Sequence, residues 1–442
     1  MSRHYVISDL HLGMGKLPDQ SWHPLEDFRS DAAFKSFLDF LEDDHADELI
    51  INGDWLDFMQ LEPYAYTPDL FSVDGHRLGW TEEESLQKLE NCRKAHAGFF
   101  SDLSSFIAAN KNRKLSVLMG NHDPDLFWPQ VQKQMRVILG SPSGSQLEFW
   151  QTSIRRGSAH IEHGNQYCSP ENKFYNPSNI FHECTADRKQ RLEMVWGTIF
   201  VMEFFNKIEE TYPFADNVKT QARALWLGIR NKWVSGTMAA KFVKFLWGAG
   251  IPWSSITANV LSAQTKQPKE LIQDIEDRDL GYDLLQIYDT DAEFQQEFDA
   301  EIANTPSEDW QGMNAPRPQQ PVSLDQLTPN AVSQSTTMGA FRDEPEFRGA
   351  RELMRGGVEQ VVFGHTHMEI DGNADNPVVP NYFNTGSWVG SIDLASRENR
   401  ERLTNLKPED LKDDSLFELR FRTTLIEVDG DKTSVSLEPI TV

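Results

Sequence analysis

The sequence predicts a mixed α/β core that is interrupted by a helical insertion. Three short apolar segments with strand character, at 4–8, 48–52 and 115–119, alternate with segments of helical spacing. Each apolar segment runs into a turn that carries Asp, Asn or His. Alternating strands and helices are typical of layered α/β folds, in which sites lie beyond the carboxyl ends of the strands. The residues that follow each strand are therefore the candidates for a functional site.

The other core elements follow from the spacing of apolar residues. Phenylalanine and leucine at helical intervals predict helices within 34–41 and within 86–107. Strand character returns at 358–364. An alternating hairpin, with arms at 417–422 and 435–437 around an Asp-Gly-Asp turn, is expected to close the chain.

The middle of the chain has a different composition. Residues 188–253 are rich in aromatic side chains at helical spacing, and ten basic and five acidic residues give this segment a charge of +5 in a chain of −26. The next segment, 269–309, is acidic and is expected to be helical around Phe294 and Phe298. Residues 305–330 are rich in Pro, Gln and Ser, which is typical of a surface loop or linker.

These changes divide the sequence into four parts. We expect a first core part at 1–182, a mainly helical insertion at 183–305, a linker at 306–340 and a second core part at 341–442 with the hairpin. Three interpretations of the insertion stay open. Its aromatic residues can form the small core of a helical subdomain, or they can bind an amphiphilic anionic ligand or make peripheral membrane contact through 188–253. The segment can also present a nucleic-acid surface.

Composition and charge narrow the classes of function. The chain has 442 residues and a formal charge of −26, which disfavours broad nucleic-acid binding because a phosphate backbone is repelled. Three cysteines form no CxxC pair, which favours a reducing compartment and gives no zinc ribbon. No signal-peptide pattern and no apolar run of about 18 residues is present. These features predict a cytoplasmic protein.

Polar residues at the strand ends form a metal-compatible set. Nitrogen and oxygen donors of this kind suit Mn, Fe, Zn or Co, and two ions ~3.5–4 Å apart can clamp a phosphoryl group. A single Asp-x-His pair is usually structural. Five strand ends that all carry metal-compatible residues in one chain, however, indicate a metal site. The set consists of Asp9, His11, Asp54, Asp57, Asn121, His122, His163, His365 and His367.

The motifs resemble those of the calcineurin-like metallophosphoesterase superfamily, over residues 1–165 and about 350–390. In order they are Asp-Leu-His at 9–11, Gly-Asp-Trp-Leu-Asp at 53–57, Gly-Asn-His-Asp at 120–123, His-Gly at 163–164 and Gly-His-Thr-His at 364–367. The resemblance implies a four-layer αββα sandwich with a di-metal site at one end. It also implies hydrolysis of phosphoric esters by a metal-bridging hydroxide.

The resemblance assigns a role to each residue. One ion would be held by Asp9, His11 and His367, the other by Asn121, His163 and His365, with Asp54 bridging both. The ions would be two divalent transition metals, with Mn favoured and Fe, Zn or Co as alternatives. His122 would assist the leaving group. Asp57 would orient His122, or would simply be a turn residue, while Asp123 would support the turn or the ligands.

Departures from related families bear on the substrate. Phe58 and Met59 follow Asp57 where protein phosphatases of the superfamily carry Arg, and Asp123 stands where they have Glu, so a protein phosphatase is disfavoured. The Asp-Leu-His-Leu-Gly opening looks more like UDP-2,3-diacylglucosamine pyrophosphohydrolases, although that family is shorter and has Arg in place of His122. In that branch a helical insertion caps the metal site, and residues 183–305 are expected to do so here.

The sequence thus predicts a hydrolase of phosphoric esters, with a phosphorylated small molecule or a lipid-like compound as substrate. Phosphodiester, phosphomonoester and pyrophosphate bonds all stay open, as does the oligomeric state. One alternative is a nuclease or nucleotide phosphodiesterase acting on nucleic-acid ends. A non-catalytic scaffold on the same fold is a further alternative, although such proteins usually lose metal ligands.

Overall fold

The chain divides into two compact units. One consists of Met1–Met202, Ser335–Gly390 and Phe417–Val442, and the other of Glu203–Gln334 and Ser391–Leu416. The candidate residues at the strand ends all belong to the first unit. The computed structural model describes residues 1–63, 70–140, 144–167, 172–202, 206–210, 288–303, 345–374, 379–390 and 419–440, with isolated positions at 142, 218–219, 236, 239–240, 269, 285, 377 and 392–393.

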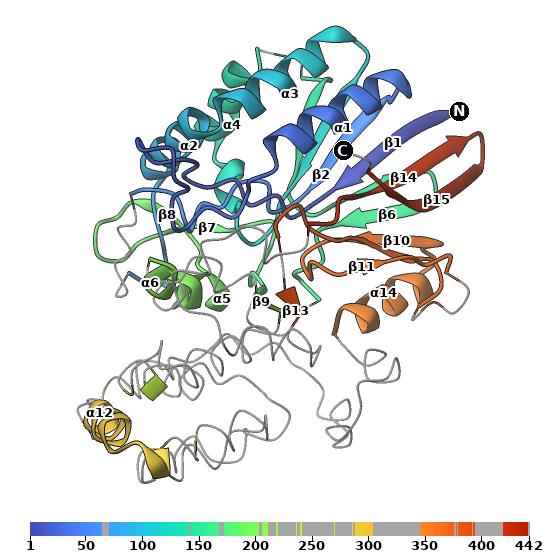
Figure 1. The fold of residues 1–442 in the computed structure, drawn as a ribbon. Coiled ribbons are helices and arrows are strands. Elements are labelled where there is room, and N and C mark those ends of the chain that lie inside the picture. The colour runs from blue at the N-terminus through green and yellow to red at the C-terminus, as the bar shows by residue number, and fades with distance from the viewer. Residues whose placement is uncertain are drawn as a thin grey trace. The chain divides into compact units, whose positions relative to one another are not determined.

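A six-stranded sheet forms one half of the core of the first unit (Figure 1). Its central strands are parallel, whereas β14 runs antiparallel to β1 and β15 runs antiparallel to β14. β2 is buried along its whole length, as expected for a parallel strand covered on both faces. The order is β15 (Lys432–Pro439), β14 (Arg422–Asp429), β1 (Ser2–Ile7), β2 (Glu48–Asn52), β3 (Lys114–Leu118) and β4 (Leu147–Trp150).

A five-stranded sheet forms the other half. Its central strand, β10, pairs in parallel with β12 and β6, while the two outer strands are antiparallel to their neighbours. The order is β11 (Glu369–Ile370), β12 (Tyr382–Thr385), β10 (Gln360–Phe363), β6 (Ala159–Glu162) and β5 (Ser153–Arg156).

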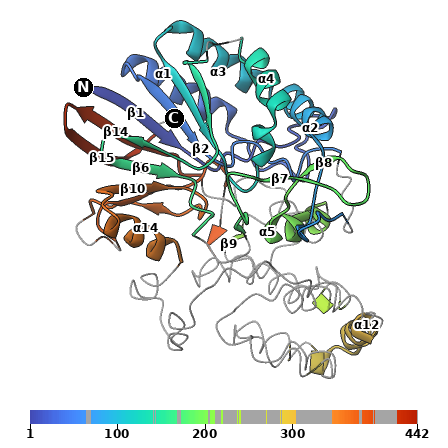
Figure 2. The ribbon, with the colours of Figure 1, turned by 180° about the vertical axis from the view of Figure 1, so that it is seen from behind.

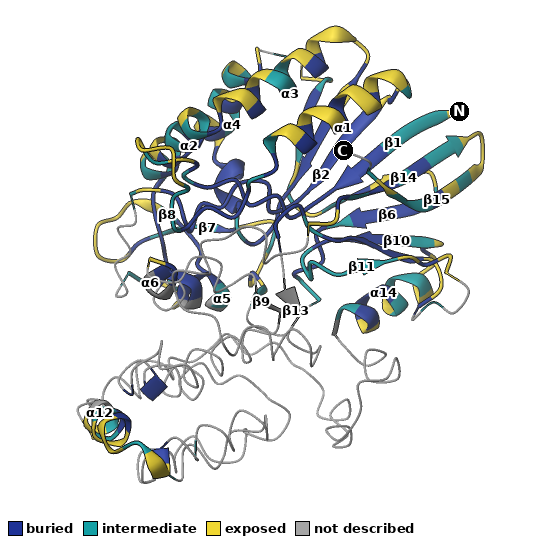
Figure 3. Cartoon of the chain, in the orientation of Figure 1, coloured by how far each residue is buried: buried dark blue, intermediate teal, exposed yellow. Residues whose placement is uncertain are grey.

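The two sheets share one apolar core. Val6 and Ile50 of the first sheet pack in the same buried cluster as Ile161, Val362 and Phe383 of the second. The inner strands β2, β6 and β10 are accordingly buried over most of their length (Figure 3). Each aliphatic side chain buried in this way contributes about 1.5–3 kcal/mol. The mixed α/β class expected from the sequence is therefore confirmed.

Helices accompany both sheets. α1 (Asp31–Asp43) buries Phe34, Phe37 and Leu38, as the helical spacing predicts. On the second sheet, Phe347 and Ala350 of α14 (Pro345–Arg355) pack against β10 and β12, and α14 lies beside β10 in both views (Figures 1 and 2). α4 (Pro129–Ile138) follows the short 3-10 turn η1 (Pro124–Phe127).

The helical pattern at 86–107 forms two helices instead of one. α2 (Glu82–Ala95) begins with a capping box between Thr81 and Glu84, and α3 (Ala97–Ala109) begins after His96. His96 leaves the helical region with φ −112° and ψ 41°. The break turns its buried imidazole toward Glu26, with Nε2 3.3 Å from Oε2.

Residues 181–192, where the sequence predicts the start of the helical insertion, form a β-hairpin. β7 (Phe181–Glu183) pairs with β8 (Gln190–Leu192), so the helix expected from residue 188 is wrong at this point. The reason lies in long-range pairing, because Leu192 accepts a backbone hydrogen bond from Gly79 and donates one to Trp80. The first helix of this region is α5 (Trp196–Phe200), which belongs to the first unit.

The second unit is described at fewer positions. α12 (Ala292–Ala303) confirms the helix expected around Phe294 and Phe298, and α6 (Asn206–Glu209) is a single turn. β9 (Val218–Lys219) pairs in parallel with β13 (Ile392–Asp393), and residues 391–416 group with this unit, whereas the sequence division placed them in the second core part. The expected linker at 306–340 and most of 188–253 lie outside the described residues.

The C-terminal hairpin is present, but its first arm is shifted. β14 spans Arg422–Asp429 instead of 417–422, because these residues pair with β1, for example Thr424 with Val6. The turn falls at Gly430. Within the described part of the chain, no helix combines the length and the apolarity that crossing a membrane requires.

Candidate metal centre

The carboxyl ends of the parallel strands of both sheets meet at one place. Asn52, the last residue of β2, donates its side-chain amide to the carbonyl of Glu162, the last residue of β6, over 2.9 Å. Its own carbonyl lies 2.8 Å from Nδ1 of His163. β1 and β10 are joined in the same way, since the backbone N–H of His365 donates to the carboxylate of Asp9 at 3.0 Å. The predicted ligands of the two sheets are thereby brought together.

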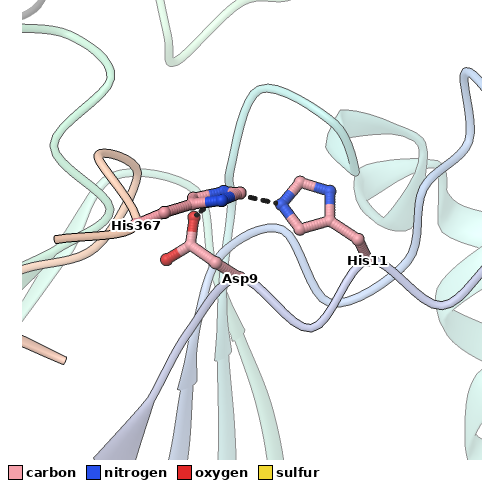
Figure 4. A group of neighbouring side chains, drawn as sticks. All are labelled: Asp9, His11 and His367. Carbon is pink, nitrogen blue, oxygen red and sulfur yellow. Dashed lines mark hydrogen bonds and ion pairs between the residues drawn. The ribbon is translucent and has the colours of Figure 1, made fainter. Parts of the chain in front are cut away.

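Asp9, His11 and His367 form the first cluster (Figure 4). Nε2 of His11 lies 3.1 Å from Nε2 of His367, which lies 3.4 Å from Oδ1 of Asp9. Asp9 is fully buried, His11 nearly so, and His367 is half-buried at the rim. This is the ligand set that the family resemblance implies for one ion.

Asp54, His163 and His365 form the second cluster. Oδ2 of Asp54 lies 3.0 Å from Nε2 of His163, and the same oxygen lies 3.8 Å from Nε2 of His11 in the first cluster. Asp54 is therefore within reach of both clusters. Its carboxylate is the one that the sequence places between two ions.

Hydrogen bonds at one ring nitrogen orient the imidazoles so that the other nitrogen faces the cluster. A carbonyl only accepts, so His163 donates through Nδ1 to Asn52 and keeps a lone pair on Nε2. His11 is held in the same way, because Nδ1 lies 3.1 Å from Oδ2 of Asp57. Metal-bound histidines usually have their second nitrogen fixed like this. Burial, together with the charge of His163, lowers the pKa of His365 to about 3, which keeps this imidazole neutral.

Several buried polar atoms lack a hydrogen-bond partner among the described residues, and two of them belong to the set predicted for the second ion. They are Oδ1 of Asn121 and Nε2 of His163, although this nitrogen lies 3.0 Å from the carboxylate of Asp54. Buried polar atoms are normally paired, so the unpaired oxygen of Asn121 fits the requirements of a cation site.

The backbone of the predicted ligands is held in a costly conformation. Asp9, His11, Asp54, His365 and His367 all have φ between 50° and 69°. For residues other than glycine this left-handed region costs about 1–2 kcal/mol each. Such strain clusters at functional sites, where the surrounding fold imposes it. Here it aims five side chains into one small space.

Glycines allow the turns to approach the ligands closely. A Cβ added to Gly120 would lie 2.0 Å from Oδ1 of Asp54, and one added to Gly53 would lie 2.4 Å from Nδ1 of His163. A Cβ at Gly364 would lie 2.7 Å from Oδ2 of Asp9. The glycines of the sequence motifs thus make room for the ligands themselves.

His122 and Asp57 are in contact. Nδ1 of His122 lies 2.8 Å from Oδ2 of Asp57, the oxygen that also contacts His11. Burial would raise the pKa of the Asp57 carboxyl, but the charge of His122 and a hydrogen bond from His11 outweigh burial and hold it below its usual range. His122 is 18% exposed, in contrast to the buried Asp57. The role of this pair in catalysis stays a prediction.

Asp123 supports the turns, one of the two uses that the sequence leaves open. Its carboxylate accepts the backbone N–H of Gly120 at 2.7 Å and that of Trp55 at 2.8 Å. It thereby ties the turn after β3 to the turn after β2, the two turns that carry Asn121 and Asp54.

Sequence reasoning missed the residues that brace these turns from behind. Lys88 is fully buried and donates through Nζ to the carbonyls of Phe58 and Leu61, in the loop that follows Asp57. Glu26 is also buried and accepts the backbone N–H of Gly15, in the loop that follows His11. A lysine on the apolar face of a helix was the only local signal for the first, and the second had none. Comparison with known proteins adds no assignment, because no protein-family model and no curated protein matches the chain.

Proposed function

We propose that this protein is a di-metal-dependent hydrolase of phosphoric esters, of the calcineurin-like metallophosphoesterase kind. One observation carries the proposal. Oδ2 of Asp54 lies 3.0 Å from a nitrogen of one three-residue cluster and 3.8 Å from a nitrogen of the other. A carboxylate that lies near two groups of nitrogen and oxygen ligands is well placed to bind two divalent ions at once.

The residues fit two ions of the borderline type, Mn, Fe, Zn or Co. Asp9, His11 and His367 would hold one, and Asn121, His163 and His365 the other, with Asp54 common to both. Bound there, such ions polarise a phosphoryl group and make a water molecule acidic enough to attack phosphorus. Mn²⁺ is the ion we favour.

The chain itself supplies the proton for the leaving oxygen. Asp57 contacts Nδ1 of His122, and this imidazole, which is 18% exposed, is proposed to face the substrate at the rim. An ionised carboxylate behind an imidazole stabilises the imidazolium form, which is the form that donates a proton. A hydrogen bond from the backbone N–H of His122 to Asp54, 2.9 Å long, fixes the acid beside the shared carboxylate.

The four-layer αββα sandwich is part of the same proposal. Two sheets with a common core support it, as do α1 beside the first sheet and α14 on the second. The residues between the His163 and His365 motifs are proposed to act as a cap that selects the substrate. A panel of nucleotides, sugar nucleotides, phospholipids and oligonucleotides, assayed with Mn²⁺, would identify the bond that is cleaved.

Metal content and hydrolysis together test the proposal. Asp54→Asn keeps the shape of the side chain and should reduce the bound Mn²⁺ by two ions per chain, with loss of hydrolysis of an aryl phosphate ester. Asp125→Asn is the matched control, because Asp125 is an equally buried carboxylate that binds Trp80 and Ser85 instead. Equal metal content in the two variants would contradict the proposal, as would a metal-loaded wild type without hydrolysis of any ester in the panel.

A further inference from the structure

A second group of histidine and carboxylate side chains lies outside the candidate metal centre. It consists of His76, His182 and Glu193, and one ligand atom from each of these side chains lies within 4.8 Å of the other two. Nε2 of His182 is 3.3 Å from Oε2 of Glu193, and Nδ1 of His76 is 3.9 Å from Oε1. Each carboxylate oxygen therefore faces one imidazole nitrogen.

The three side chains are largely withdrawn from solvent. Their exposed fractions are 8% for His76, 12% for His182 and 7% for Glu193. The backbone N–H of Tyr175 donates to Oε1 of Glu193 at 2.8 Å, which fixes the orientation of the carboxylate. A carboxylate held in this way beside two imidazoles is a preformed set of donors.

One of the two donor distances has the value expected around a tetrahedral ion, and the other is a few tenths of an ångström longer. Zn²⁺ binds imidazole nitrogen at about 2.0–2.1 Å and carboxylate oxygen at about 2.0–2.2 Å, which places neighbouring ligand atoms roughly 3.3–3.5 Å apart. The rings of His76 and His182 are stacked, with centroids 4.5 Å apart and an interplanar angle of 23°.

Three segments distant in sequence deliver these ligands. His76 lies in the loop at 70–79, His182 lies in β7, and Glu193 follows β8. Backbone hydrogen bonds already join the segments, among them Gly79 to Leu192 at 2.8 Å and Met194 to Arg77 at 2.9 Å. The residues that carry the ligands are therefore held together by backbone hydrogen bonds, which give the rigid support that metal sites need.

We infer that His76, His182 and Glu193 bind a Zn²⁺ ion, with the fourth position open to water. The ion joins the 70–79 loop to the β7–β8 hairpin. Two histidines and one carboxylate form a recognised ligand set for zinc. This inference does not depend on the proposed function, because it shares no residue with the candidate metal centre.

A zinc count with a matched control tests the site. The full chain carrying Asp54→Asn, in which the di-metal centre is disabled, is dialysed against Zn²⁺ and analysed for metal. Adding His182→Ala should lower the content by one zinc per chain. Adding His4→Ala should not, although His4 also pairs with a buried carboxylate, because Glu48 is already bound by Arg156. An equal zinc content in the two double variants overturns the inference.

The unmodified protein gives a second readout that does not depend on how the variants fold. Crystals grown with excess Zn²⁺ and measured at the zinc absorption edge should show an anomalous peak about 2.0–2.2 Å from His76 Nδ1, His182 Nε2 and a Glu193 oxygen. A map without a peak between these three side chains overturns the inference. Peaks at the Asp54 carboxylate would bear on the proposed function alone, so the two ideas fail separately.

Discussion

Two groups of metal-compatible side chains in the described part of the chain are built in different ways. The candidate metal centre takes its ligands from turns that follow five parallel strands, and five of those residues have a left-handed backbone. The cluster of His76, His182 and Glu193 takes its ligands from a loop and a hairpin joined by backbone pairing. The left-handed backbone and the close glycine contacts at the first site are typical of functional sites. The second group instead joins two segments that are neighbours in the fold. Substitutions that affect one site and spare the other would test this distinction.

The largest effect is expected from a single methyl group at the candidate metal centre. Gly120→Ala places a Cβ 2.0 Å from Oδ1 of Asp54 and 2.4 Å from its backbone nitrogen, so the shared carboxylate must move. We expect the two ions and measurable ester hydrolysis to be lost, while the zinc at His182 is retained. Metal analysis and an aryl phosphate assay measure both quantities.

The control for this change is Gly98→Ala. Gly98 lies in α3, and a Cβ added there meets nothing within 4 Å. The substitution should leave metal content and hydrolysis unchanged and should stabilise the helix by about 0.5–1 kcal/mol. If Gly120→Ala retained both ions and full activity, the close packing of this turn against Asp54 would have no functional meaning.

A smaller effect is expected from His122, which contacts Asp57 but is not among the predicted ligands. His122→Ala should keep the metal content and lower turnover by ~10²–10⁴-fold, the usual contribution of a general acid. The loss should be smaller for a substrate with a nitrophenolate leaving group, which needs no proton, than for an alkyl ester. Equal losses on both substrates would exclude proton donation and leave a role in binding.

The difference between the two groups also shows what the sequence can predict. The first group was predictable because each ligand directly follows an apolar strand, and parallel strands bring their carboxyl ends together. His76, His182 and Glu193 have no such local signal, since a loop and a hairpin meet only in the folded chain. The same limit explains two errors in the secondary structure. β8 replaces an expected helix because it pairs with the 70–80 segment, and the hairpin arm moves to 422–429 because it pairs with β1.

The bracing residues behind the candidate metal centre were missed for the same reason. In the sequence Glu26 has no local signal, and Lys88 has only its position on the apolar face of a helix, yet both are buried and bind backbone groups of the turns that carry His11 and Asp57. The carbonyls bound by Lys88 and the Gly15 N–H bound by Glu26 lie at least 11 residues away along the chain. Only the fold reveals that these charges stabilise the geometry of the ligands.

The smallest effect concerns this bracing and appears as a pH dependence of stability. The imidazole of His96 lies 3.3 Å from Glu26, whose carboxylate also holds the loop after His11. Burial lowers the pKa of His96, but the charges of Glu26 and Asp31 outweigh it and raise the pKa from 6.5 to about 9. The folded chain therefore binds a proton here more tightly than the unfolded chain does.

The sign of the effect follows from this difference. Below pH 6.5 both states are protonated and the stabilisation is fully present, and it is lost as the pH rises through about 9. The full difference corresponds to about 3 kcal/mol at ~1.4 kcal/mol per pKa unit. Urea unfolding at pH 6 and pH 9 should show the wild type losing up to this amount more stability than His96→Gln. Glu26→Gln should remove most of the same pH dependence, because it removes the charge that raises the pKa. Parallel pH profiles for the wild type and His96→Gln would mean that Glu26 braces the loop after His11 without help from a charged His96.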